Sequence, residues 1–387
     1  MPKLAQFSIL NEPIICYNRL MTYNWELPNW PNFKYDPSGL DDILLSFSEK
    51  SGRVRGLVEA LPENIQNETI LDLMVSEAIK TSEIEGEYLS RQDVMSSIRN
   101  NLGLVKDFEP VRDKRAGGIA SLMVDVRKSY PEPLTSQMLF RWHELVMCGN
   151  RFVKAGAWRD HSEPMQVISG PLGKETVHFE APPSSRIPEE MSRFIEWFNA
   201  SAPGGQQEIK KAPIRSAIAH IYFESLHPFE DGNGRVGRAI SEKALSQGAG
   251  RPILLSLSRT IEAHKRDYYD ALKRTQTSND ITLWIHYFVN VILQAQTEAE
   301  QQVNFTLLKA KFFDRHKNHI NERQLIVIRR MLEEGVGGFE GGINARKYIA
   351  ITHVSKATAT RDLQDMEQKG ILESLGSGRS TRYQIAL

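Results

Sequence analysis

Apolar residues recur at helical spacing along most of this chain, and this period limits the fold more than any other feature of the sequence. The helical pattern begins at Asp41. One predicted helix opens at Thr69 and carries Ile70 and Ile79 on its apolar face. It stops near Gly86, since glycine favours the C-terminal cap position. The sequence therefore predicts a mainly α protein.

A hairpin is predicted at one place in the first three hundred residues. Segments 165–168 and 175–179 are typical of two short strands, because β-prone residues flank the turn-rich stretch 169–174. The remaining segments predict helices: two between residues 110 and 150, one over 187–200, one from Pro213 to His227, one from Gly234 to Gly248 or Gly250, and two or three over 258–300.

The last eighty residues have a different pattern and a different charge. Three helices are predicted at 321–334, 344–350 and 355–369, followed by short strands at 371–373 and 382–385. Residues 305–387 contain 14 Lys and Arg against 9 Asp and Glu. This outline predicts a winged helix-turn-helix that docks on DNA or on another protein. The third helix offers polar side chains to bases or phosphates, namely Ser355, Lys356, Thr358, Thr360 and Arg361.

The bulk composition bounds the class of protein and says little about its activity. A chain of 387 residues is long enough for two or three domains. Its 48 basic and 48 acidic residues cancel, so no global field attracts nucleic acid or a membrane. The two cysteines, Cys16 and Cys148, form no disulfide framework. With no signal-peptide layout and no membrane-length apolar run, the chain is expected to be cytoplasmic.

The residues that point to chemistry lie between His227 and Arg238. A predicted helix ends at His227, a glycine-containing loop follows, and a new helix begins with two arginines on one face. Gly232–Gly234 precede that helix, where backbone N–H groups converge on an anion. Arg235 and Arg238 suit phosphate oxygens, and Asp231 suits Mg²⁺. His227 can accept a proton near neutral pH, so the set fits phosphoryl or nucleotidyl transfer.

Simpler interpretations of these residues stay open at this point. Residues 232–237 satisfy Gly-x-Gly-x-x-Gly, but a dinucleotide site requires a preceding strand and a helix is predicted instead. A histidine before a proline is often only a helix end, and Asp231 could cap the next helix. His220 suggests a metal ligand, although without a third ligand a core histidine is the better interpretation.

The whole stretch resembles the signature of the Fic family, His-Pro-Phe-x-Asp/Asn-Gly-Asn-Gly-Arg-x-x-Arg, at every fixed position. The resemblance implies an all-helical core that transfers AMP from ATP, with Mg²⁺, to a Ser, Thr or Tyr hydroxyl. It implies His227 as the base, Asp231 as the metal site and Phe229 as a core anchor. It makes the hairpin a flap that holds the target segment. The ATP site it implies comprises Gly232, Asn233, Gly234, Arg235, Val236, Gly237, Arg238 and, more loosely, Tyr269.

A second stretch, Thr81-Ser82-Glu83-Ile84-Glu85-Gly86, resembles the Fic inhibitory motif Ser/Thr-x-x-x-Glu-Gly/Asn. The resemblance implies that Glu85 pairs with Arg238 and withdraws it from the ATP γ-phosphate. Taken alone, Glu85 would be an exposed charge at the unfavourable end of a helix.

The prediction is therefore an autoinhibited protein adenylyltransferase with an N-terminal helical region (1–108), a Fic core (109–300) and the C-terminal winged helix (305–387). Its partner is a protein bearing a hydroxyl side chain, and self-modification is expected. The alternatives are an enzyme that also removes AMP, a relative that transfers another group, and a transcription regulator that senses ATP. The sequence leaves the target, the base specificity and the oligomeric state open, a homodimer included.

Overall fold

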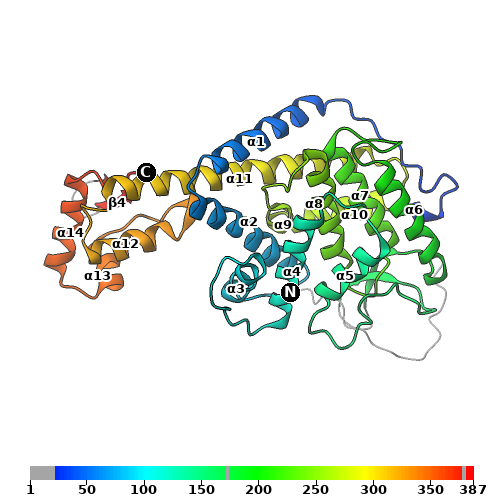
Figure 1. The fold of residues 1–387 in the computed structure, drawn as a ribbon, viewed down its shortest axis with the longest axis horizontal. Helices are drawn as coiled ribbons and strands as arrows, with labels where there is room; N and C mark the ends of the chain where they lie inside the picture. Colours follow the sequence, from blue (N-terminus) through cyan, green and yellow to red (C-terminus); the bar gives the residue numbers. More distant parts are fainter. Residues whose placement is uncertain (1–21, 171–173, 377–380) are drawn as a thin grey trace. The chain divides into compact units, whose positions relative to one another are not determined.

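The computed structural model describes residues 22–170, 174–376 and 381–387. These residues form fourteen α-helices, three short 3₁₀ helices and two antiparallel hairpins (Figure 1). The predicted mainly α fold is confirmed. The helices are α1 Asp41–Glu59, α2 Glu63–Ile84, α3 Arg91–Leu102, α4 Lys114–Ser129, α5 Ser136–Val146, α6 Ile187–Ala200, α7 Ala212–Leu226, α8 Asn233–Ala249, α9 Leu257–Ala263, α10 Lys265–Thr275, α11 Thr282–His316, α12 Glu322–Leu332, α13 Ala345–Thr352 and α14 Lys356–Gln368. The strands are β1 Gln166–Ser169, β2 Thr176–Glu180, β3 Leu372–Leu375 and β4 Arg382–Ile385.

The chain divides into two compact units. Unit 1 comprises the described part of Met1–Gly52 together with Ile70–Thr297, and unit 2 comprises Arg53–Thr69 and Glu298–Leu387. The predicted boundary at residues 300–305 falls inside α11, which continues across it as one helix. The division into three domains stays a prediction.

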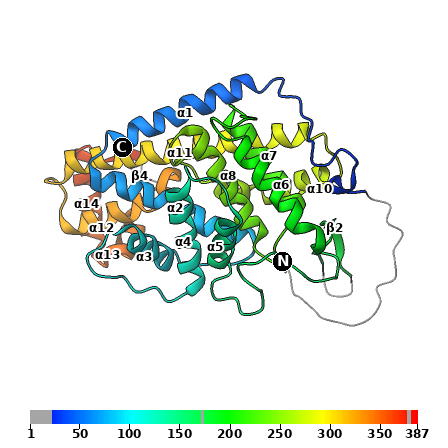
Figure 2. The ribbon, with the colours of Figure 1, turned by 45° about the vertical axis from the view of Figure 1, so that its right-hand side comes forward.

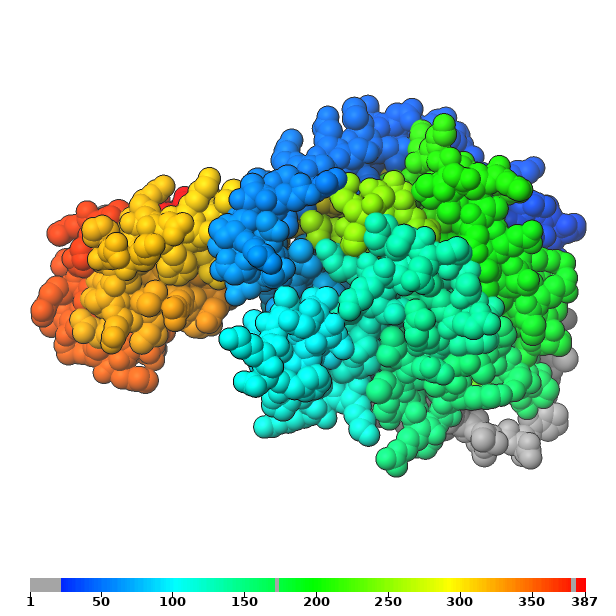
Figure 3. All heavy atoms as spheres, viewed as in Figure 1, coloured from blue at the N-terminus to red at the C-terminus, as the bar shows by residue number. Residues whose placement is uncertain are grey.

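Helices α7 and α8 form the centre of unit 1. They lie side by side in both ribbon views, with α4, α5 and α6 packed against them (Figures 1 and 2). Every residue of α7 after Ala212 is buried, so this helix has no solvent face. A helix that is apolar around most of its circumference must lie in a core. The teal and green segments, which include α4, α5 and α6, cover most of the face of unit 1 seen in Figure 3.

Local sequence signals account for most helix starts. Proline occupies the first turn of α6 and of α7, where its missing N–H has no helical partner to lose. Thr135 caps α5 by accepting a hydrogen bond from Met138 N. The start predicted at Thr69 is wrong, because α2 already begins at Glu63. The Thr69 hydroxyl donates back to Ile65 O at 2.7 Å inside the helix and caps nothing.

The predicted first hairpin is present, within one residue of the expected strands. β1 and β2 pair antiparallel with a bulge between Val167 and Ile168. The turn residues 171–173 lie outside the described residues. The N-terminal segment fixes the far end of β2: Trp25 Nε1 donates to Glu180 O at 2.7 Å, and the Tyr23 ring meets that of Phe179 edge to face. One end of the hairpin is therefore attached to the core.

Unit 2 contains the three helices and the hairpin in the order predicted for a winged helix-turn-helix. Its core gathers Val327, Ile328, Tyr348, Leu363 and Met366. Buried Asp362 on α14 accepts a hydrogen bond from Tyr348 Oη at 2.8 Å and so ties α14 to α13. No helix in the described part of the chain is long and apolar enough to cross a membrane.

Candidate active site

Residues of the loop between α7 and α8 help to fix its conformation. His227 follows the last residue of α7 with φ 47° and ψ 58°, a left-handed conformation that non-glycine residues rarely adopt. The Asn233 amide then clamps Phe229: its Oδ1 accepts from Phe229 N at 2.9 Å and its Nδ2 donates to Phe229 O at 2.8 Å. Asn233 is therefore a loop-shaping residue in this structure.

The N-terminus of α8 has no side-chain cap. Gly232, with φ 78°, is the N-cap residue. Asp231, which the sequence also allowed as a cap, instead accepts from Gly232 N, at 2.6 Å through Oδ1. The Asp231 side chain is 37% exposed. A half-exposed carboxylate beside uncapped N–H groups fits a Mg²⁺ ion that also binds phosphate oxygens.

The Arg238 side chain is buried and held by hydrogen bonds to the segment that follows Lys80. Its guanidinium donates to Glu85 Oε1 at 2.8 Å, to Thr81 Oγ1 at 2.7 Å and to Thr81 O at 2.9 Å. Its side chain is 1% exposed, against 23% for Glu85. The structure thus brings together the two residues that the inhibitory motif pairs. Thr81 serves as a second partner for the arginine.

The carboxylate of Glu85 also lies against the start of α8. A Cβ added at Gly234 would collide with Glu85 Oε1. The Lys265 ammonium holds the end of α2 in this position by donating to Ile84 O. Burial raises the pKa of Glu85, but the charges of Arg238 and Arg235 outweigh it and hold that pKa below its usual value. Glu85 is therefore an ionised carboxylate placed where an anion would bind.

Glu87 gives the same segment a second ion pair. Its Oε2 lies 3.0 Å from Nη1 of Arg235, whose side chain is 3% exposed. Asp231 Oδ1 is farther from this arginine, at 3.9 Å. Both arginines of the loop are thus paired with carboxylates from residues 85–87.

His227 lies with Nδ1 buried, and its side chain is 17% exposed. Since Nδ1 faces the interior, Nε2 is the nitrogen that can meet a bound group. Burial, reinforced by the charge of Arg159 and opposed by that of Glu85, lowers the pKa of His227 to about 4. The imidazole is therefore neutral at pH 7 and can accept a proton.

Glu224 is a buried carboxyl group that the sequence analysis did not single out. Its Oε2 lies 3.7 Å from His227 Nδ1, and its Oε1 blocks any side chain at Gly237. Burial raises its pKa to about 8, although Arg238 opposes the shift. Glu224 is accordingly protonated at neutral pH.

The structure also shows the surroundings of the remaining residues that the sequence analysis named. Val236 is buried in the core, and Tyr269 on α10 stands half-buried beside Lys265, whose Nζ lies 5.8 Å from the ring centroid. His220 lies between Tyr268 Oη at 2.7 Å and Ser241 Oγ at 3.0 Å, which makes it a core histidine. In the described residues, no group of three potential metal-binding side chains occurs.

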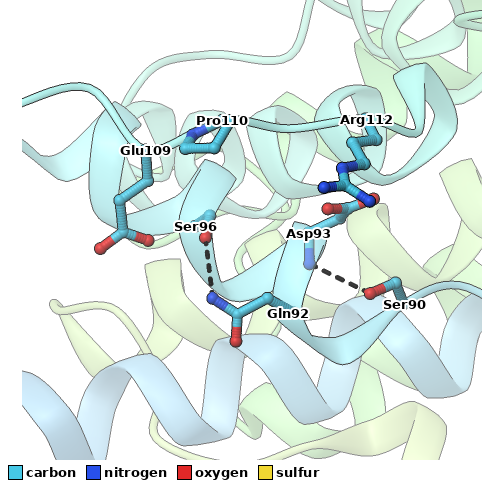
Figure 4. A pocket seen from close by; sticks show the side chains of 7 residues that line it. All are labelled: Ser90, Gln92, Asp93, Ser96, Glu109, Pro110 and Arg112. Carbon is cyan, nitrogen blue, oxygen red and sulfur yellow. Dashed lines mark hydrogen bonds between the residues drawn. The ribbon is translucent and has the colours of Figure 1, made fainter.

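A surface pocket of about 390 Å³ lies elsewhere, at the start of α3 (Figure 4). None of the residues discussed above lines it. Oε2 of Glu109 is buried without a hydrogen bond, but the other oxygen of this carboxylate lies 3.6 Å from Arg99 Nη1. The charge is therefore paired, and we assign no second site to the pocket. It is lined by Ser90, Gln92, Asp93, Ser96, Glu109, Pro110 and Arg112.

Comparison with known families places this loop within a recognised domain. The sequence profile of the Fic/DOC family matches residues 133–245, which include the loop and both central helices. The chain carries a Fic domain. A domain of unknown function, DUF4172, matches residues 23–104, ahead of the Fic domain. The C-terminal domain of the transcriptional regulator DIP2311-like family matches residues 340–386.

Two curated relatives each match less than a third of this chain. A protein named protein adenylyltransferase Fic from Culex quinquefasciatus is 31% identical over 101 residues, 26% of this chain and 18% of that protein. A probable protein adenylyltransferase from Aquifex aeolicus is 26% identical over 116 residues, 30% of this chain and 31% of that protein. The chain thus spans less than a third of the length of these relatives.

Solved structures agree on the fold. A Fic family protein from Desulfovibrio desulfuricans superposes with a TM-score of 0.51 at 18% identity, covering 92% of this chain and 98% of that one. Fic-1 from C. elegans gives a TM-score of 0.50 at 17% identity and covers 70% and 73% of the two chains. At these identities the likeness concerns the fold alone.

Sequence reasoning did not single out four residues around the loop from His227 to Arg238, namely Glu224, Glu87, Arg159 and Lys265. Glu224 stands one helical turn before His227, a spacing that the sequence alone could have revealed. Glu87 stands two residues after Glu85, and no spacing rule links it to Arg235. Arg159 is distant from the loop in sequence and no local pattern marks it.

Proposed function

We propose that this chain transfers AMP from ATP to a hydroxyl side chain of a protein, and that Glu85 holds the enzyme in a restrained state. The observation that carries the proposal is the position of the Glu85 carboxylate. It pairs with Arg238 at 2.8 Å and lies against Gly234 at the uncapped start of α8. A carboxylate placed there occupies the kind of site that binds a phosphate. The names of the curated relatives support AMP transfer.

In the proposed AMP transfer, the His227 end of the loop accepts a proton and the Arg238 end binds phosphate. The hydroxyl oxygen of the target attacks the α-phosphorus of ATP, the bond to the β-phosphate oxygen breaks, and pyrophosphate leaves. His227, neutral at pH 7, accepts the hydroxyl proton at Nε2. The N–H groups at Gly232–Gly234 and the guanidinium groups of Arg235 and Arg238 stabilise phosphate charge. When bound, Mg²⁺ would be held by Asp231 and would neutralise phosphate charge.

The restraint acts through the arginines. Arg238 cannot donate fully to Glu85 and to an outer phosphate at once, because its donors form one planar fork. With Glu85 in place, ATP would lack this contact and would bind in a pose that does not present its α-phosphate. Tyr269, on α10, would contribute to the adenine pocket.

Intact-mass measurement tests the proposal. The wild type and the Glu85→Gly variant are incubated with Mg²⁺ and each nucleoside triphosphate in turn. A covalent gain equal to one AMP, seen with ATP and stronger in the variant, supports it. A gain that matches another nucleotide or a phosphate identifies a different transferase. Reversible ATP binding with no covalent gain supports an ATP-sensing regulator, and loss of AMP from a pre-labelled protein identifies the bifunctional enzyme.

A second function, DNA binding by unit 2, is favoured by the surface of α14. Lys356, Thr360 and Arg361 are exposed on this helix, whereas Ser355 is used as its N-cap and accepts from Thr358 N. Arg346 on α13 is also exposed. Duplex DNA should be retarded by the full chain, with an affinity that falls steeply as salt rises. Arg361→Ala should weaken this binding. Absence of retardation at low salt would favour protein docking instead.

A further inference from the structure

A buried arginine without an acidic partner stands behind the base. Arg159 lies in the segment before β1 and is 2% exposed. Among the described residues, no carboxylate pairs with its guanidinium. A buried guanidinium without a countercharge is unfavourable unless every N–H has an acceptor. The contacts of the Arg159 guanidinium are therefore the key to its role.

All the acceptors of Arg159 are neutral oxygens, and they come from two places. Nε donates to His227 O at 2.8 Å, and Nη2 donates to Leu226 O at 3.4 Å, so one edge of the guanidinium holds the end of α7. Nη1 donates to Ser184 Oγ at 2.8 Å, and Nη2 also donates to Pro182 O. Pro182 and Ser184 follow directly on β2, the second strand of the hairpin.

The backbone around Arg159 adds to this attachment. Arg159 N donates to Pro228 O at 3.0 Å, so the carbonyl groups of two consecutive loop residues are fixed from one position. The ring of neighbouring Trp158 lies 5.0 Å from that of Phe229. His227 sits at the centre of these contacts in its left-handed conformation. A non-glycine residue keeps such a conformation only where its surroundings hold it.

We infer that Arg159 is a positioning residue. It fixes the backbone of His227, and with it the direction of the imidazole, relative to the β1–β2 hairpin, which is the flap expected to hold the target segment. This inference rests on the proposed role of His227 as base. Arg159 touches neither ATP nor the target in this account, so it is not a catalytic residue. A planar fork that satisfies several carbonyl oxygens at fixed angles cannot be replaced by an ammonium group, although the charge is the same.

The chain offers a matched control in Arg215. It is also buried, 1% exposed, and its guanidinium donates to neutral oxygens, including Ser201 Oγ at 3.0 Å and Phe198 O at 2.8 Å. Burial lowers the pKa of Arg215 and that of Arg159 alike, to about 10. Arg215 lies at the other end of α7, away from the loop. Both arginines support the fold, but only one supports His227.

The experiment compares Arg159→Lys with Arg215→Lys, each in the full-length Glu85→Gly protein. Self-modification is followed by intact mass at saturating ATP and as a function of ATP, at a temperature where thermal melts show all proteins folded. Arg159→Lys should lower the maximal rate about tenfold or more while the KM for ATP stays within about twofold. Arg215→Lys should leave the maximal rate within about twofold. Equal maximal rates in the two variants would overturn the inference.

A second measurement needs no activity. The ring-proton titration of His227 is followed by NMR in Arg159→Met and Arg215→Met, with Glu224, Glu85 and Arg238 unchanged around it. Removing the Arg159 charge should raise the pKa of His227, which that charge helps to lower, and Arg215→Met should leave it unmoved. Identical titrations in both variants would overturn the inference. If Glu85→Gly alone shows no transfer, the proposed function fails, and this titration still decides whether Arg159 governs His227.

Discussion

The two ends of the loop from His227 to Arg238 are held by opposite kinds of contact. At the His227 end, a buried cation donates to neutral carbonyl oxygens, and the adjacent Glu224 is protonated. At the Arg238 end, a buried cation pairs with an ionised carboxylate from the turn that follows α2. Backbone hydrogen bonds to a buried arginine do not respond to an incoming anion, whereas an ion pair does. Under the proposed function, we therefore expect the His227 end to keep its contacts when ATP binds (the permanent end) and the Arg238 end to exchange Glu85 for phosphate (the releasable end).

The two carboxyl groups near Arg238 make the same contrast. Glu85 and Glu224 both feel the charge of this arginine, yet the pKa of Glu85 is lowered and that of Glu224 is raised. Glu85 accepts a hydrogen bond from the guanidinium, and Glu224 does not. Environments that shift the pKa values of two carboxyl groups in opposite directions suit them to different tasks.

The largest expected effect tests the permanent end. His227→Ala should lower AMP transfer by roughly a hundredfold or more, since general-base catalysis contributes that order of magnitude. ATP binding should persist, because the N-terminus of α8 is unchanged. Transfer is measured by intact mass in the Glu85→Gly protein and ATP affinity by calorimetry. Transfer near the unmutated rate would remove His227 from the mechanism.

The next effect tests the releasable end. Glu85→Gly should raise self-modification by about tenfold or more, as expected for loss of one charge-assisted arginine contact of about 1.5–3 kcal/mol. Arg238→Ala should give no such rise, and the double variant should behave like Arg238→Ala, because the arginine serves both partners.

Glu83→Gly is the matched control for this activation. It places the same flexible residue in the same helical turn, but Glu83 pairs with Lys80 at 2.5 Å and with neither arginine. Activation by Glu83→Gly as strong as by Glu85→Gly would mean that loosening α2, and not freeing Arg238, is what matters. Unchanged or lower transfer in Glu85→Gly would contradict the restraint altogether.

The sequence predicted the central part of this site because its signals are local. The helix that ends at His227, the glycines before α8 and the two arginines on one face follow from spacing within twelve residues. The helix at Ile187–Ala200 and the hairpin follow from periodicity and turn residues in the same way.

What the sequence did not predict depends on contacts between distant segments. Arg159 and Lys265 act on carbonyl groups 68 and 181 residues away, respectively, and no spacing rule connects such pairs. Helix α3 was missed although Ser90 and Asp93 mark its start, because its polar sequence weakens the apolar period. The start of α2 was misplaced, since Thr69 uses its hydroxyl inside the helix.

A smaller effect is expected from Glu87, and it tests whether this carboxylate restrains the releasable end together with Glu85. Glu87→Gln removes the partner of Arg235 and should lower the KM for ATP about twofold to fivefold, because the Glu87 side chain is 31% exposed and such pairs are weak. Combined with Glu85→Gly, the change should multiply the activation. Glu83→Gln is the control. An unchanged KM in both backgrounds would leave Glu85 as the one restraining carboxylate among residues 83–87.

The smallest effect on transfer is expected from Glu224→Gln, and its main consequence is for stability. Burial raises the pKa of Glu224 to about 8, above its value in an unfolded chain, so the folded state holds a proton that the unfolded state releases. The contribution of Glu224 to the free energy of unfolding is present in full below the pKa that this group has in the unfolded chain. It is lost as the pH rises from there toward 8. Glutamine is neutral throughout, so the variant should gain about 1–3 kcal/mol on the wild type between pH 5 and pH 8. Urea unfolding at several pH values measures the difference, and transfer at pH 7 should change less than about twofold. Parallel stability curves would show that Glu224 is already ionised beside His227, and the base end would then be as charged as the phosphate end.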